Sequence, residues 1–451
     1  MRNESYDSSL FNEDWLKKEE SVLESFLKES EYYNTTTKSL EKIWERETSS
    51  IPQSSKENYY FLKFLDKEQL LYKVSHSEPN QESLILSTKS FPELLNTKIE
   101  TFVISDNEKY IALRTSKGGS DWNDVYTYEL ESRKIFPEVI KGLRISNLEW
   151  SLDSQGYLYT QSTIKENDYK YEIIHFDVLT SQSRTIYKIL ENQPLAVKAN
   201  YIDNDQIVIN ILNKTRNNSL FTLNLNTQEK TNIDQTFNWT YEIICSKNNS
   251  LYFISNRDSN YKKVVKYDLL NNSWTSVFSV ETSELSSARL LDNKIIINMF
   301  EDAKSVLYTI DLNGHVLDSI NLLVPSTIYL GQCTKESKSL YIGASNHLHR
   351  LKLSKIDEKG IDKELDINNS QQDNLSFISK QVFVTNREGI KVPLFISYKR
   401  GLKLDGKAPL ILRTYGGFSF INSPRYMPEM SAWMNSGGIV VIANIRGGGE
   451  Y

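Results

Sequence analysis

The sequence predicts a β-propeller of about seven blades, preceded by an N-terminal helical arm and followed by the beginning of an α/β domain. Three observations support this prediction. Alternating strand patterns recur between about residues 57 and 370, a helical pattern precedes them, and continuous apolar runs follow them. A single β-sandwich is the alternative, but about 300 residues of short strands exceed the length of an ordinary sandwich.

The predicted arm covers residues 12–46. Its apolar residues recur near helical spacing with Glu and Lys between them, so one face of the helix is apolar. This stripe predicts that the arm packs against another part of the protein. Its members are Trp15, Leu16, Val22, Leu23, Phe26 and Leu27.

The central region repeats a pattern of an apolar strand, a polar turn and a second strand. Measured from Val103, Glu149, Tyr201, Ile243, Leu290 and Gly331, the pattern recurs at intervals of 41 to 52 residues. A period in the forties with about four strands per unit is typical of propeller blades. A weaker set of strands before residue 100 brings the number of blades to about seven. The best examples are 101–116, 148–162, 200–212, 241–256, 288–300 and 331–345.

The pattern changes after residue 375. Residues 381–400 predict a hairpin, and 427–438 predict a helix that ends at glycines. The segments 408–418 and 439–451 contain continuous apolar strands, which are typical of a parallel sheet covered on both faces. Strand, helix and strand in this order predict the start of an α/β domain.

The composition of the chain limits which classes of function and which cellular locations are expected. The net charge is −5 and 25% of the residues are charged. The sequence contains no basic stripe of the kind that indicates nucleic-acid binding. Two cysteines, Cys245 and Cys333, form no disulfide framework and favour a reducing compartment. The sequence starts without a signal-peptide pattern and has no apolar run of about 20 residues, so we expect a cytoplasmic protein without membrane contact.

The candidate site is "RTYGGF", residues 413–418, at the end of a predicted strand. Open α/β sheets place their ligand sites at such ends. The hydroxyl of Tyr415 is a candidate oxyanion donor and Phe418 a candidate wall of an apolar pocket. Turn packing by an aromatic residue beside two glycines is the alternative.

A nucleophile and its base are missing from the pattern. The sequence has no G-x-S-x-G motif, and its five histidines (His76, His175, His315, His347 and His349) all precede the predicted α/β segment. His347 and His349 lack matching acidic or cysteine ligands, so we expect a structural or solvent-facing role for them and no metal site. Dinucleotide and Walker patterns are also missing, and the sequence therefore predicts no cofactor.

Four stretches resemble the prolyl oligopeptidase family of serine peptidases. They are residues 116–130, 254–269, 382–418 and 437–451, and residues 13–27 are similar to the family's helical arm. The resemblance implies an α/β-hydrolase domain, formed by both chain ends, and a seven-bladed propeller inserted between them. It also implies cleavage of short peptides after proline, with Tyr415 in the oxyanion hole and Phe418 lining the proline pocket. Thr414 stands where the family more often has glycine.

The same resemblance predicts a truncated peptidase. The serine, aspartate and histidine of the family lie beyond the part matched here, so we expect the chain alone to be inactive. The expected domains are the arm (1–56), the propeller (57–375) and an incomplete hydrolase domain (376–451). The expected partners are short proline-containing peptides, and a separately encoded C-terminal half that pairs with the strand at 409–413 is a further candidate. A non-catalytic propeller that binds peptides or proteins is the alternative.

Overall fold

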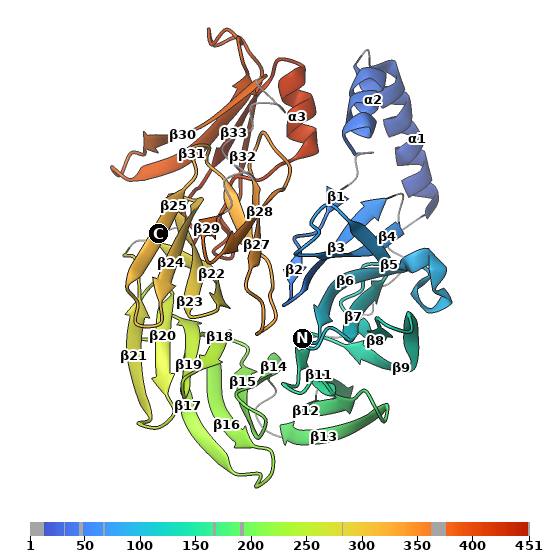
Figure 1. Ribbon diagram of the computed structural model, residues 1–451. Coiled ribbons are helices and arrows are strands. Elements are labelled where there is room, and N and C mark those ends of the chain that lie inside the picture. The colour runs from blue at the N-terminus through green and yellow to red at the C-terminus, as the bar shows by residue number, and fades with distance from the viewer. Residues whose placement is uncertain are drawn as a thin grey trace.

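The computed structural model describes residues 13–30, 32–44, 48–65, 68–165, 168–189, 194–281, 283–361 and 376–449. Within these residues, seven antiparallel sheets follow one another along the chain, and an eighth sheet follows them. Figure 1 shows the seven sheets arranged in a ring, with the eighth sheet and the helices at one end. The predicted propeller of about seven blades is confirmed.

The first sheet contains β1 (Thr48–Ser49), β2 (Gln53–Ser54), β3 (Asn58–Leu65), β4 (Glu68–Ser75) and β5 (Glu82–Ser87). The second sheet contains β6 (Thr97–Ile104), β7 (Tyr110–Lys117), β8 (Asn123–Glu129) and β9 (Lys134–Leu143). The third sheet contains β10 (Glu149–Trp150), β11 (Gly156–Lys165), β12 (Asp168–Asp177) and β13 (Gln182–Ile189). The fourth sheet contains β14 (Ala196–Tyr201), β15 (Gln206–Leu212), β16 (Asn218–Asn224) and β17 (Lys230–Trp239). The fifth sheet contains β18 (Tyr241–Lys247), β19 (Ser250–Ser255), β20 (Lys263–Asp268) and β21 (Ser273–Phe278). The sixth sheet contains β22 (Glu284–Leu291), β23 (Lys294–Glu301), β24 (Lys304–Asp311) and β25 (Val316–Asn321). The seventh sheet contains β26 (Thr327–Leu330), β27 (Leu340–Ser345), β28 (Lys352–Asp357) and β29 (Gly360–Ile361).

The core of the propeller consists of separate apolar clusters between neighbouring sheets. One cluster joins Leu71 of the first sheet to Ile111 of the second, and another joins Val208 of the fourth to Phe253 of the fifth. The middle strands are buried on both faces, which is why their sequences are almost continuously apolar. Each sheet is therefore held by its two neighbours.

Amide side chains reinforce several of these junctions by pairing with the backbone of the next sheet. Gln69 of β4 donates to the Ile99 carbonyl at 2.9 Å and accepts from the Ile99 amide at 2.6 Å. Asn210 of β15 donates to the Tyr241 carbonyl at 2.8 Å, and Asn298 of β23 donates to the Ile328 carbonyl at 2.8 Å. These bonds satisfy backbone groups on the first strand of the following sheet.

The ring closes between the seventh and first sheets through hydroxyl groups. Ser54 of β2 forms an isolated bridge with Cys333, and its Oγ lies 2.8 Å from Ser339 Oγ. Tyr59 and Tyr341 pack against each other across the same junction, with ring centroids 4.7 Å apart and the ring planes tilted by 40°. Because β1 and β2 pair with β3, residues 48–54 lie in the first sheet, although the expected boundary assigns them to the arm.

One predicted strand was placed too late in the sequence. The stretch 331–345 was expected to contain two strands, but the first strand of the seventh sheet is β26, Thr327–Leu330. Residues 331–339 form the loop whose Cys333 meets Ser54. Residues 362–375, where the expected propeller boundary falls, lie outside the described residues.

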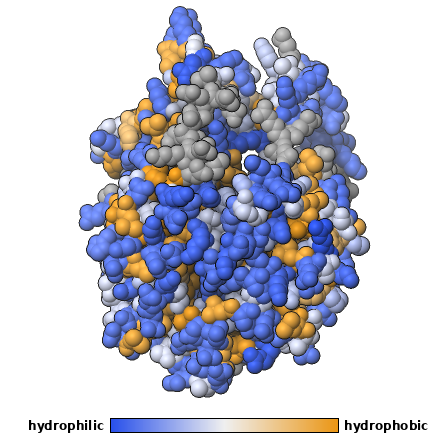
Figure 2. Space-filling model, viewed as in Figure 1, coloured by the Kyte–Doolittle hydropathy of each residue, from blue (hydrophilic) through white to orange (hydrophobic). Residues whose placement is uncertain are grey.

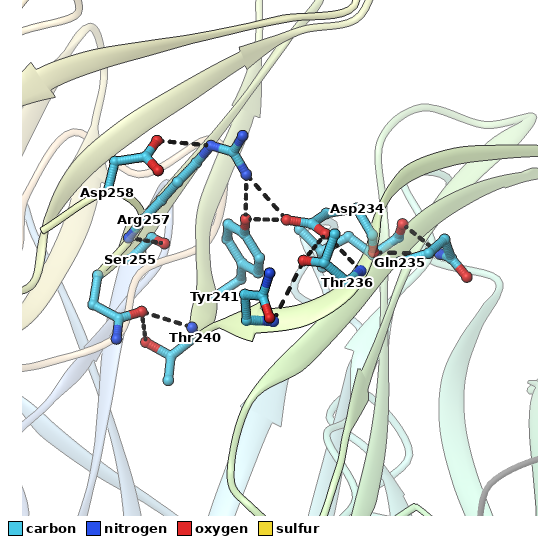
Figure 3. A network of polar contacts seen from close by, with 11 residues as sticks. Asp234, Gln235, Thr236, Thr240, Tyr241, Ser255, Arg257 and Asp258 are labelled. Carbon is cyan, nitrogen blue, oxygen red and sulfur yellow. Dashed lines mark hydrogen bonds and ion pairs between the residues drawn. The ribbon is translucent and has the colours of Figure 1, made fainter.

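A polar network centred on Asp234 joins the fourth and fifth sheets (Figure 3). The buried carboxylate of Asp234 accepts hydrogen bonds from the Tyr241 hydroxyl at 2.6 Å, Arg257 Nη1 at 3.0 Å and Thr236 Oγ1 at 2.6 Å. The Arg257 guanidinium also lies 4.8 Å from the centre of the Trp274 ring. Burial acts to raise the pKa of Asp234, but these hydrogen bonds and the charge of Arg257 outweigh it and lower that pKa.

The eighth sheet has the order β30 (Phe377–Thr385), β31 (Lys391–Lys399), β33 (Ile439–Ala443) and β32 (Leu410–Thr414). The first two strands form the predicted hairpin, and β32 runs parallel to β33 with α3 (Pro428–Asn435) between them in sequence. In the part of the chain described, β32 is an edge strand. Its side chains are exposed, Leu412 by 61%, whereas the apolar pattern predicted a strand covered on both faces.

The arm consists of two helices, α1 (Glu13–Glu29) and α2 (Tyr33–Trp44). Helix α2 contacts α3, which brings the N-terminal arm beside the eighth sheet (Figure 1). The predicted apolar stripe of α1 is exposed, with Val22 at 65% and Phe26 at 70%. On the face shown in Figure 2 the propeller surface is predominantly hydrophilic, with hydrophobic residues in separate patches.

Candidate active-site loop

The "RTYGGF" segment lies directly after β32, and a second glycine segment, residues 447–449, follows β33. The two strands are parallel, so both segments emerge at the same end of the sheet. The segments touch: a Cβ on Gly416 would lie 2.5 Å from the Arg446 carbonyl oxygen, and one on Gly449 would lie 2.7 Å from the Ser419 carbonyl oxygen. The glycines of "RGGGEY" therefore allow close approach to the Tyr415 loop.

Tyr415 contacts Phe420 at this end of the sheet. The two rings meet edge to face, with centroids 5.7 Å apart. The Asn422 side chain donates to the Tyr415 carbonyl at 2.7 Å, and the Asn422 backbone amide donates to Asn444 Oδ1 at 2.9 Å. Since Asn444 follows β33 directly, these bonds anchor the Tyr415 loop to the sheet.

A pocket of about 250 Å³ lies beside these groups. Its lining combines two guanidinium groups, hydroxyl and amide groups and two aromatic rings. Among the residues that line it, none is a histidine or a carboxylate, so the pocket offers groups that stabilise negative charge and no general base. The lining residues are Arg413, Thr414, Tyr415, Phe420, Asn422, Ser423, Arg425, Met427 and Ile442.

The two sequence-predicted residues occupy different positions. Tyr415 lines the pocket, whereas Phe418 is 89% exposed and does not belong to the lining. Phe418 and Ser419 both have left-handed backbone conformations, with φ of 57° and 55°. This reversal of the chain brings Phe420 onto Tyr415. Phe420 was missed because two phenylalanines two residues apart give no local signal for which of them turns inward.

We expect Gly447→Ala to disturb the contact between the glycine segments. Gly447 has φ of 93°, and an added Cβ would lie 2.0 Å from the Gly416 carbonyl oxygen. The matched control is Gly389→Ala, because Gly389 has φ of 82° with open space around its Cβ position. Both variants incur the backbone cost of about 1–2 kcal/mol, but only Gly447→Ala should also expose the 413–420 loop to limited proteolysis. Equal protease sensitivity of the two variants would contradict the packing described here.

His347 lies where the propeller meets the eighth sheet. Its ring packs edge to face on Phe395 of β31, and its Nδ1 lies 3.4 Å from Ser379 Oγ and 3.3 Å from Ser397 Oγ. The side chain is buried and its Nε2 has no hydrogen-bond partner. Burial lowers the pKa of His347 to about 4, so the folded protein holds this imidazole neutral.

This junction should weaken in acid. The unfolded histidine titrates near 6.5 and the folded one near 4, so the unfolded chain binds the proton first as the pH falls. The associated loss of stability begins below about 6.5 and amounts to about 2 kcal/mol at pH 5. Urea denaturation of wild type and His347→Gln at pH 7.5 and 5.0 measures it. The variant should lose less stability than wild type between the two pH values; an unchanged pH dependence in His347→Gln would refute the prediction.

In the described residues, no group of three or more His, Cys, Asp and Glu side chains is placed to hold a metal ion. None of the described helices is long and apolar enough to span a membrane.

The structure defines a class of protein in which a seven-bladed propeller is followed by a strand, helix and strand bearing a Tyr-Gly-Gly loop. Residues 6–349 match the family model described as the prolyl oligopeptidase N-terminal β-propeller domain. The chain belongs to the prolyl oligopeptidase family, whose members are serine peptidases.

The curated relatives are longer than this chain. The prolyl endopeptidase of Elizabethkingia meningoseptica is 27% identical over 97% of this chain, which spans 64% of that protein. The prolyl endopeptidase of Dictyostelium discoideum is 22% identical, with 97% of this chain and 68% of that protein covered. Prolyl oligopeptidase B from Galerina marginata, solved with a 35mer hydrolysis and macrocyclization substrate, matches with a TM-score of 0.85 at 17% identity, over 99% of this chain and 68% of that one. At this identity the structural match establishes the fold.

Proposed function

We propose that the chain provides the propeller and the first part of the α/β-hydrolase domain of a serine endopeptidase that cleaves short peptides after proline. The observation that supports this most directly is the Tyr415 loop. It leaves the carboxyl end of a parallel strand, is fixed by Asn422 and Asn444, and packs against the second glycine segment. A rigid hydroxyl in this position is suited to donate to a developing oxyanion.

In this proposal Tyr415 is the oxyanion donor and Phe418 a wall of the proline pocket. Tyr415 is half exposed, so its hydroxyl is accessible to a substrate carbonyl. The exposed ring of Phe418 is available for contact with a substrate or with a further segment of the hydrolase domain. The guanidinium groups of Arg413 and Arg425 add positive charge beside the pocket.

We further propose that the 451-residue polypeptide is inactive alone. An activated serine needs a base, and the pocket lining contains neither histidine nor carboxylate. The missing groups would come from a further hydrolase segment, on the same chain or separately encoded. The exposed edge of β32, with Leu410, Ile411 and Leu412, is suited to pair with a strand of that segment.

Turnover of a fluorogenic Gly-Pro peptide tests this function. The 451-residue chain is compared with a fusion that adds the remaining C-terminal part of the E. meningoseptica prolyl endopeptidase. We expect turnover by the fusion, abolished by a serine-directed inhibitor, and none by the chain alone. Inhibitor-sensitive turnover by the chain alone would refute its inactivity, and a folded fusion without turnover would count against the peptidase function.

A propeller that binds peptides or proteins without catalysis is the second candidate. A cavity of about 550 Å³ within the propeller favours it, because ligand pockets commonly have this size. The fusion assay separates the two candidates, since a pure binding module gains no turnover from an added hydrolase segment.

A further inference from the structure

A cavity lies within the propeller, away from the Tyr415 loop. It has a volume of about 550 Å³ and is lined by residues of the third to seventh sheets. Its walls include the first strands of four successive sheets, β10, β14, β18 and β22, of which β14 and β18 lie near the middle of the ring in Figure 1. First strands of propeller blades surround the central channel, so this cavity is part of that channel.

Charges of alternating sign project into the cavity from these strands. Glu149 lies on β10, Lys198 on β14, Glu242 on β18 and Arg289 on β22. The strand period explains why they face inward: Lys198 is exposed between the buried Val197 and Ala199, which pack between sheets. On these four first strands the order is therefore acid, base, acid, base. Arg216 and Lys262 also line the cavity, and Lys262 pairs with Glu284 at 2.8 Å.

The four charged groups do not neutralise one another directly. Among the ion pairs of the described residues, none joins any two of these four side chains. Arg289 is oriented by bonds from Nη1 to the Ala288 carbonyl at 2.8 Å and from Nε to the Gly331 carbonyl at 3.3 Å. Lys198 and Glu242 are exposed to the cavity.

Glu149 is the most deeply placed of the four. Its carboxylate accepts a hydrogen bond from Asn200 at 3.1 Å. Burial raises the pKa of Glu149 to about 7, although the charge of Lys335 and the bond from Asn200 act in the opposite direction. Of the two carboxyl side chains in the lining, Glu242 is the one exposed to the cavity, so it is the accessible acceptor.

We propose that this cavity binds a short peptide as a zwitterion, with the free amino terminus at Glu242 and the free carboxylate at Lys198 and Arg289. The sheets that carry Lys198 and Arg289 lie on either side of the sheet that carries Glu242. The acceptor for the amino terminus and the donors for the carboxylate are therefore on the first strands of three successive sheets. Charge-assisted hydrogen bonds of this kind are the strong ones. The choice of a peptide rests on the function proposed above, but binding here requires no hydrolysis.

The neutral part of the lining also suits a peptide. Asn200 and Gln332 present amide groups, which both donate to and accept from peptide bonds. Ile243 and Ile244 supply apolar surface for side chains such as proline. The volume limits the ligand to a few residues, because a cavity of this size falls in the range of small-molecule sites.

Isothermal titration calorimetry on the 451-residue chain tests the proposal. The ligands are Ala-Pro-Ala with free termini, its N-acetylated form and its C-terminal amide. Each blocked form should bind about tenfold more weakly than the free peptide, the change that corresponds to about 1.4 kcal/mol.

Two variants assign the termini to side chains. Glu242→Gln should weaken binding of the free peptide about tenfold and leave the affinity for the N-acetylated peptide unchanged. Lys198→Gln should also weaken binding of the free peptide about tenfold, but it should leave the affinity for the C-terminal amide unchanged. Both side chains are exposed, so both variants should fold. The matched controls Glu138→Gln and Lys134→Gln, on the outer strand β9, should bind as wild type.

Equal affinity for the free and blocked peptides would overturn the proposal, as would equal weakening of every ligand by either variant. Failure to detect binding of the free peptide at about 10 mM would overturn it as well, since a Kd near 1 mM is already weak. These outcomes are independent of the fusion assay, which measures turnover at the Tyr415 site.

Discussion

Asp234→Ala is expected to lower the free energy of unfolding by about 3 kcal/mol, because it removes the acceptor at the centre of a buried network. Tyr241, Thr236 and Arg257 all donate to this carboxylate (Figure 3). The Asp234 side chain is 4% exposed. Without it the Arg257 guanidinium is left partly buried over Trp274 with one fewer partner. Urea denaturation at pH 7 measures the loss.

Asp258→Ala is the matched control for this prediction. Asp258 pairs with the same Arg257 at 3.5 Å, but its side chain is 70% exposed. An exposed ion pair contributes about 1 kcal/mol or less, so the control should remain close to wild type. Similar losses in both variants would show that burial of the Asp234 network does not govern the junction between the fourth and fifth sheets.

The pH dependence of Asp234 provides a second check on that network. The pKa of this carboxyl is lowered in the folded protein, so its stabilisation is present above the unfolded value near 3.9 and is lost as the pH falls through the folded pKa. The difference in stability between wild type and Asp234→Ala should therefore decrease in acid. This is a different range from that of His347, whose effect begins near pH 6.5.

Tyr415→Phe, introduced into the active fusion, is expected to lower kcat about 100-fold with little change in KM. The substitution removes the hydroxyl and retains the ring that packs on Phe420. A donor that acts only on the oxyanion contributes in the transition state and not in substrate binding, which is why kcat and kcat/KM should fall together.

Tyr426→Phe is the corresponding control. It removes a hydroxyl from the same segment, on a ring that packs against Arg350 outside the pocket. Its kcat should match that of the unmodified fusion. A Tyr415→Phe fusion with unchanged kcat would exclude this hydroxyl from the oxyanion hole, even if the fusion itself is a proline-specific peptidase.

The propeller was predictable because its strands are specified locally. Within each blade, neighbouring strands follow one another closely in sequence. The alternation of apolar and polar residues marks each strand, and polar turns mark its ends. The placement of β26 could not be obtained in this way, because Cys333 and its loop are positioned by Ser54, which is remote in sequence and lies in the first sheet. Long-range closure of the ring leaves no periodic signal in either segment.

The candidate site was predictable only in part. The Tyr-Gly-Gly segment identified Tyr415, but the inward position of Phe420 depends on left-handed residues at 418 and 419 and on contact with Gly449. The charged cavity escaped sequence analysis altogether, because Glu149, Lys198, Glu242 and Arg289 come from four blades. Single charged residues in strands separated by about forty residues resemble ordinary solvent-facing positions.

The most direct test of the central proposal is labelling with a fluorophosphonate probe, read by mass spectrometry of the native proteins. We expect the 451-residue chain to stay unlabelled, including Ser419 and Ser423 beside the pocket, because no base activates them. The fusion should be labelled at one serine of the added hydrolase segment. Stoichiometric labelling of a serine within the 451-residue chain alone would contradict the proposed inactivity of this chain.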